Sequence, residues 1–204
     1  MKKFFLFVSV CFLFCFQVFA EHSLHAGLVF SFFDGSDEQK PYDPDDIDSS
    51  AVGLCFEYVY ENNSGLVFKA GNSISSVNSS RDYDSFTVTE EGIEAELYLG
   101  LGYAFIKNQN TSFFITGNAG IKGHLIFEES VDGNDRVLDR SAYMFTFGPE
   151  LNFSRKLNEH LGFFANAGFM YNLGRSNNNA IPSWIESDIY GFCVPVKAGL
   201  LYTF

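Results

Sequence analysis

Apolar and polar residues alternate along most of the chain, which is the period of a β-strand and not of a helix. In the clearest run, residues 93–103, every second position is apolar, and the positions between hold glutamate, tyrosine or glycine. Helical spacing is not sustained anywhere beyond residue 20. The pattern predicts eight strands, which cover residues 24–32, 52–60, 66–71, 93–103, 113–127, 143–153, 161–173 and 190–204.

The connections between these strands alternate in length. Short turns are predicted around residues 62–64, 107–110 and 155–159, and long polar loops over residues 34–49, 75–90, 128–140 and 175–187. An even number of antiparallel strands, with short turns at one end and long loops at the other, is typical of an outer-membrane barrel. The predicted fold class is therefore all-β, an eight-stranded antiparallel transmembrane β-barrel with short periplasmic turns and long extracellular loops.

Alternation alone does not say which face of the barrel is apolar, because a soluble eight-stranded barrel hides its apolar face inside. Here the opposite face is rich in glycine and poor in charge, which suits a narrow interior better than a surface in water. The apolar face also ends in aromatic residues at both ends of the barrel, as expected at two membrane–water interfaces. These residues are Tyr60, Tyr103, Phe153, Phe163 and Tyr202 at the short-turn end and Phe32, Phe127, Tyr143, Tyr171 and Tyr190 at the loop end.

Residues 1–20 differ in composition from the rest. Lys2 and Lys3 precede an apolar run that closes on Val18-Phe19-Ala20, the pattern of a secretory signal peptide. We therefore divide the chain into a signal peptide, residues 1–20, and a barrel domain, residues 21–204. Without the two lysines the formal charge falls from −12 to −14, which argues against nucleic acid as a partner. No later stretch is apolar for long enough to form a membrane-spanning helix.

The last strand carries a resemblance to a known family. Val194-Pro-Val-Lys-Ala-Gly-Leu-Leu-Tyr-Thr-Phe204 resembles the C-terminal signature of bacterial outer-membrane barrels, in which Tyr202 and Phe204 would be the signal read by the barrel-assembly machinery. The eight-strand plan is similar to the small barrels of the OmpA, OmpX and OmpW kind. This resemblance implies a cell outer membrane location, with membrane lipid and the assembly machinery as partners, and we expect a monomer. Pro149 and Pro195 lie within predicted strands, where we expect local bulges.

Charged residues on the predicted inner face are few. They are Glu57, Lys69, Glu94, Glu96, Lys122, His124, Glu150 and Lys197. A turn centred on Asn63 would place Glu57 opposite Lys69, and a turn centred on Gln109 would place Glu96 opposite Lys122 and Glu94 opposite His124. Unpaired charges in a narrow lumen are costly, so we expect these groups to pair. The network is then either a structural plug or the lining of a gated polar pore.

Other candidate chemistry is weak. His25 and His124 face inward without a serine-rich motif beside them, and the acidic loop lacks the glycine and terminal glutamate of an EF-hand. That loop, residues 34–48, holds seven acids, of which Asp43, Asp45, Asp46 and Asp48 are the candidates for binding Ca²⁺. We therefore expect no catalytic residues, metal or cofactor. Cys55 and Cys193 are expected at similar heights but about 9–10 Å apart, with one strand between them, and a disulfide tolerates only about 7 Å between Cα atoms. Both thiols are predicted to be free.

The function predicted from the sequence is that of an integral outer-membrane barrel with a structural or surface-interaction role, as an adhesin or a shield. An extracellular ligand would bind through the acidic loops. The alternative is a narrow channel for small or apolar solutes.

Overall fold

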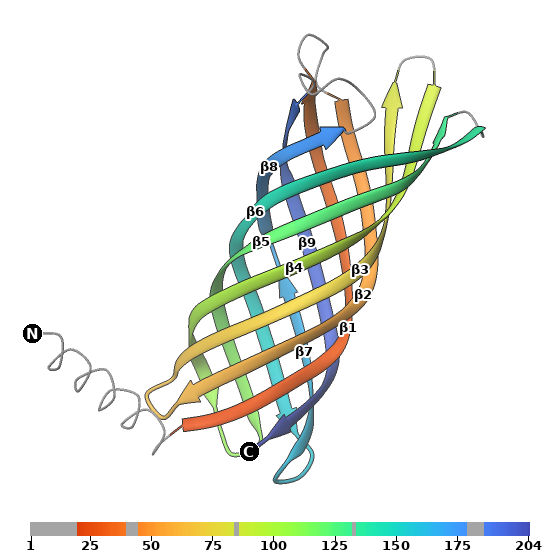
Figure 1. Ribbon diagram of the computed structural model, residues 1–204. Helices are drawn as coiled ribbons and strands as arrows, with labels where there is room; N and C mark the ends of the chain where they lie inside the picture. The colour runs from red at the N-terminus through yellow and green to blue at the C-terminus, as the bar shows by residue number, and fades with distance from the viewer. Residues whose placement is uncertain (1–19, 40–44, 84–85, 132–133, 179–185) are drawn as a thin grey trace, which may run out of the picture.

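The computed structural model describes residues 20–39, 45–83, 86–131, 134–178 and 186–204. These residues form one antiparallel sheet that closes on itself (Figure 1), because β1 pairs with β9 as well as with β2. The strands are β1 (Ala20–Gln39), β2 (Asp45–Asn62), β3 (Leu66–Tyr83), β4 (Phe86–Lys107), β5 (Thr111–Val131), β6 (Asn134–Lys156), β7 (Leu161–Gly168), β8 (Met170–Asn178) and β9 (Glu186–Thr203). Residues 1–19 of the predicted signal peptide, residues 1–20, lie outside the described residues, and the signal peptide stays a prediction.

The strands β7 and β8 are two halves of one barrel strand. Both pair with β6 on one side and with β9 on the other, and the register continues unchanged across Phe169. The nine segments therefore make an eight-stranded barrel, as the alternation predicts.

Two prolines explain this interruption. Residues of a hydrogen-bonded antiparallel pair exchange two bonds, but Pro149 accepts a bond of 2.9 Å from the Phe169 N–H and has no N–H to return. Pro195 lies beside Gly168 from the other neighbouring strand. The expected bulges at Pro149 and Pro195 are wrong, since the register passes through both prolines without a shift. The break falls instead on the strand between them, which loses bonds on both sides.

The strands extend well beyond the predicted apolar runs. Most of the residues assigned to the long loops belong to strands: β3 continues to Tyr83 and β4 begins at Phe86, so two residues connect them. The predicted loop boundaries are therefore wrong, although the longer strands still project at the end opposite the short turns (Figure 1). Outside a membrane both faces of a hairpin contact water, so neither face needs apolar residues. The hydrogen-bonded strand pairs therefore continue where the apolar alternation stops.

The short turns lie where they are predicted, but one of them changes the register. Between β2 and β3 the turn is Asn63-Ser64-Gly65, and Gly65 has a φ of 87°. A three-residue hairpin loop that ends in a left-handed glycine is a common type. The turn is centred on Ser64, one residue later than expected, so Glu57 lies opposite Gly71 and not opposite Lys69.

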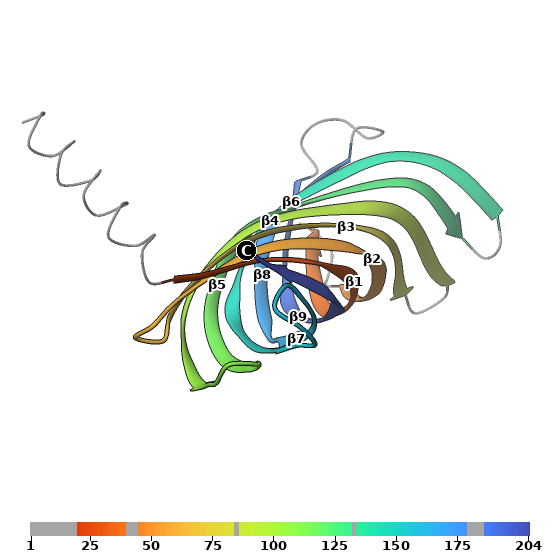
Figure 2. The same cartoon turned by 90° about the horizontal axis from the view of Figure 1, so that it is seen from below.

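Exposure alternates along the strands as a lipid-facing barrel requires. Outward apolar side chains are largely exposed, for example Leu99 at 58% and Phe145 at 67%, whereas inward neighbours such as Tyr98 and Met144 are buried. Figure 2 shows the strands as a ring seen from the short-turn end. The soluble-barrel alternative would bury these residues. In the described part of the chain, none of the secondary structure is a helix long and apolar enough to cross a bilayer.

Candidate functional site

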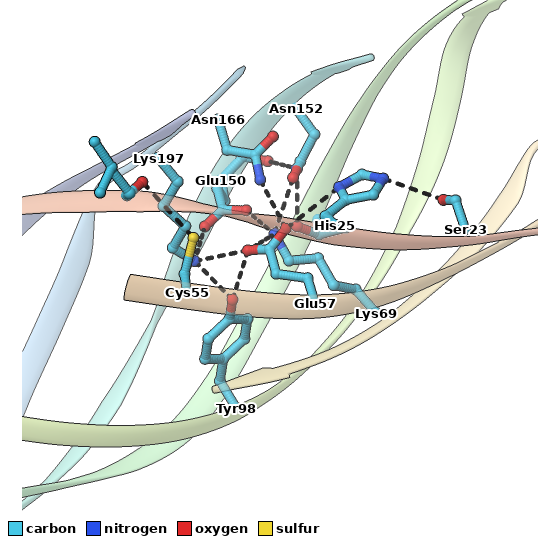
Figure 3. A network of polar contacts seen from close by, with 12 residues as sticks. Ser23, His25, Cys55, Glu57, Lys69, Tyr98, Glu150, Asn152, Asn166 and Lys197 are labelled. Atoms are coloured by element: carbon cyan, nitrogen blue, oxygen red, sulfur yellow. Dashed lines mark hydrogen bonds and ion pairs between the residues drawn. The ribbon is translucent and has the colours of Figure 1, made fainter. Parts of the chain in front are cut away.

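Five buried side chains meet in the lumen and form what we call the lumen plug (Figure 3). They are Glu57 on β2, Lys69 on β3, Tyr98 on β4, Glu150 on β6 and Lys197 on β9. None is more than 4% exposed. Because β4 and β9 are four strands apart around the ring, the plug joins opposite walls of the barrel.

The two lysines of the plug each bind both glutamates. Lys197 Nζ lies 3.0 Å from Glu57 Oε1 and 2.9 Å from Glu150 Oε2. Lys69 Nζ lies 3.0 Å from Glu57 Oε1 and also contacts Glu150 Oε1. The formal charges of the four groups therefore cancel within one cluster, which is the arrangement that a poorly hydrated interior favours.

Neutral polar groups complete the plug. Tyr98 donates its hydroxyl hydrogen to Glu57 and accepts a hydrogen bond of 2.9 Å from Lys197. Asn166 Nδ2 donates to Glu57 Oε2 at 2.9 Å, and Asn152 Oδ1 accepts from Lys69 at 3.0 Å. Sequence reasoning missed these three partners because they carry no charge. The sequence did carry one signal for them, because the alternation places all three on the inner face near the charged residues.

A histidine chain that was not anticipated borders the plug. Ser23 Oγ lies 3.1 Å from His25 Nε2, and His25 Nδ1 lies 3.6 Å from Glu57 Oε2. Ser23 and His25 share the inner face because residues two apart on a strand point to the same side. The His25 ring also stacks on Phe164 at 4.6 Å, and all of these groups are buried. The arrangement fills the lumen beside Glu57.

A second, smaller cluster lies above the plug. Glu96 is opposite Lys122 and Glu94 is opposite His124, which are the registers predicted from the sequence. An ion pair nevertheless runs diagonally, with Lys122 Nζ 3.0 Å from Glu94 Oε1, while Glu96 Oε1 accepts a hydrogen bond of 3.0 Å from Thr146. A lysine side chain is long enough to reach such a diagonal neighbour.

A cavity of about 40 Å³ lies above this cluster, toward the loop end. Its lining combines carboxylates, Glu90 and Glu94, with apolar side chains such as Phe33, Met144 and Ile189. A volume of this size holds a few water molecules. No group of three or more His, Cys, Asp or Glu side chains among the described residues is placed to hold a metal ion; Asp43 of the acidic loop lies outside those residues.

Cys55 and Cys193 are free and buried, as predicted. The expectation of similar heights is wrong, however. Cys55 lies opposite Gly27 of β1, whereas Cys193 lies opposite Phe33, six residues further along the same strand. The two thiols are therefore separated along the barrel as well as around it.

Comparisons with known proteins agree on the fold. No protein-family model and no curated protein matches the sequence. Among solved structures, the outer membrane protein OprG from Pseudomonas aeruginosa superposes with a TM-score of 0.55 at 14% identity, covering 91% of this chain and 96% of OprG. A major outer membrane protein from Thermus thermophilus gives 0.53 at 12% identity, covering 87% and 99% of the two chains.

The outer membrane protein AlkL gives a TM-score of 0.50 at 12% identity, covering 91% of this chain and 90% of AlkL. At these identities the similarity establishes the fold alone. It confirms the predicted fold class and the resemblance to small outer-membrane barrels, and it supports the predicted outer-membrane location. The chain has the fold of a small eight-stranded outer-membrane β-barrel.

Proposed function

We propose that this chain is an integral outer-membrane β-barrel with a structural or surface-interaction role, as an adhesin or a shield, and that its lumen is closed to solutes. The lumen plug is the observation that carries this proposal. Opening a path would require separating Lys69 and Lys197 from Glu57 and Glu150, all of which are at most 3% exposed. Breaking a buried pair in this way costs about 3–5 kcal/mol. The narrow channel is therefore the less favoured function.

Conductance in planar lipid bilayers tests the closed lumen. The wild-type barrel is expected to pass almost no current, whereas replacing Glu57, Lys69, Glu150 and Lys197 together by serine is expected to open a measurable path. Equal, steady conductance of the two proteins would favour the channel for small or apolar solutes. Heat-dependent gel mobility shows whether both proteins are folded.

The strand extensions at the loop end support a role at the cell surface. Several of their acidic side chains are exposed, including Asp34, Asp48, Glu91 and Glu128. Arginines such as Arg175 also lie at this end, but acidic side chains predominate in the strand extensions. A projecting surface with an excess of negative charge attracts basic partners and repels anionic ones. An adhesin would use the attraction, and a shield would use the repulsion.

The hairpin of β5 and β6 offers a direct test of this surface role. Glu128 and Val137 are opposite each other, so replacing residues 129–136 by Asn-Gly shortens the hairpin without disturbing the register below it. Adherence of cells to polylysine-coated glass is expected to fall if the barrel is an adhesin, and adherence to anionic surfaces is expected to rise if it is a shield. Unchanged adherence in both assays, with equal amounts of folded barrel, would contradict the surface role.

A further inference from the structure

Asn72 is an amide at the middle of the lipid-facing surface. It lies on β3 and points outward, and its side chain is exposed. Its direct neighbours across the sheet are Phe56 on β2 and Leu97 on β4, which are 52% and 58% exposed. Asn72 is six residues from Leu66, which lies opposite Tyr103 of the aromatic girdle at the short-turn end. At about 3.3 Å per residue and a tilt of about 45°, this places the amide about 14 Å into the bilayer.

The amide has no partner there. No hydrogen bond joins the Asn72 side chain to another side chain or backbone group in the described ranges. Hydrocarbon tails offer neither donors nor acceptors, and an amide without a hydrogen bond in an apolar medium costs several kcal/mol. Headgroups do not reach this depth. A partner that brings both a donor and an acceptor into the membrane is therefore needed.

The surface around Asn72 is shaped for close approach. Two depressions of about 690 and 530 Å³ adjoin it, and both include the side chains of Leu97 and Ile121. One depression is bordered by Ala70 and Ala119, and the other by Ala95 and Gly123. A methyl group built on Gly123 would meet no atom within 4 Å. Small residues beside an apolar ridge let two membrane proteins pack closely.

We propose that a second copy of this chain docks on this face, with the two Asn72 amides hydrogen-bonded to each other across a twofold axis. An amide carries both a donor and an acceptor, so the same residue on two copies is self-complementary. The exposed side chains of this face near Asn72 are uncharged, and two copies therefore do not repel. A lipid chain would fill the depressions but would leave the amide unpaired. The proposal rests on membrane insertion of the barrel, not on its surface role, and it replaces the expected monomer.

The oligomeric state in lipid vesicles tests this proposal. Wild-type protein is expected to dimerise, and Asn72→Leu is expected to lower the association constant by about tenfold. The matched control is Ala165→Leu on β7, four strands away around the ring, which is expected to leave association unchanged. A wild-type protein that stays monomeric at every protein-to-lipid ratio would overturn the proposal.

Cross-linking locates the interface. In a protein with Cys55 and Cys193 replaced by alanine, Ala70→Cys is expected to form a disulfide-linked dimer in vesicles, and Ala165→Cys is not. Adding Asn72→Leu is expected to suppress the Ala70→Cys dimer. Cross-linking that is insensitive to Asn72→Leu, or equal from both cysteine positions, would contradict the interface. Protein that does not float with the vesicles would contradict membrane insertion itself, so the two failures are distinguishable.

Discussion

Arginine in place of Leu99 is expected to destabilise the barrel by about 2–4 kcal/mol in a lipid bilayer. Leu99 points outward from β4 and is 58% exposed, between Ala70 on β3 and Ala119 on β5. In water such an exposed position would tolerate arginine, but near the bilayer midplane the guanidinium loses its hydration. Urea unfolding of the protein in vesicles measures the change.

Leu157→Arg is the matched control for this prediction. Leu157 lies in the short turn between β6 and β7 and is 70% exposed, so the same substitution outside the hydrocarbon layer is expected to change stability little. If Leu99→Arg and Leu157→Arg unfolded at the same urea concentration as the wild type, the outward face would not be the lipid-facing one.

Methionine in place of Lys69 is expected to cost about 3–5 kcal/mol of unfolding free energy, because it leaves one buried negative charge of the plug uncompensated. Lys69 is 0% exposed and contacts Glu57, Glu150 and Asn152. Methionine keeps the length of the side chain and removes the charge. The remaining lysine of the plug, Lys197, then faces two glutamates alone.

Two further variants separate charge balance from packing. Lys69→Met combined with Glu150→Gln restores neutrality, and this double variant is expected to recover a large part of the loss. Lys156→Met removes an ion pair of 2.7 Å to Glu21 whose side chains are 20% and 36% exposed, and it is expected to cost less than about 1 kcal/mol. A Lys69→Met protein as stable as Lys156→Met would show that the plug does not stabilise the barrel.

Several features of the barrel could be predicted from the sequence because they depend on local geometry. Successive side chains of a strand point to opposite faces, so the alternation in residues 93–103 and its counterparts assigns each residue to the lumen or to the lipid. The same parity placed Glu57, Lys69, Glu150 and Lys197 on the inner face. The predicted pairs Glu94–His124 and Glu96–Lys122 are also correct, although a register shift between Ala104 and Ile106 separates them from the turn.

Other features depend on how distant strands meet, so the sequence alone could not predict them. The left-handed Gly65 moved the β2–β3 register by two positions, and Pro149 and Pro195 interrupted the strand that lies between them. Closure of the ring brought Lys197 to Glu57 and Tyr98, which no pairwise register predicts. The outward position of Asn72 also came from the structure, because the predicted strand ended at residue 71. That its amide has no partner depends on the whole surface around it, and so on the tertiary structure.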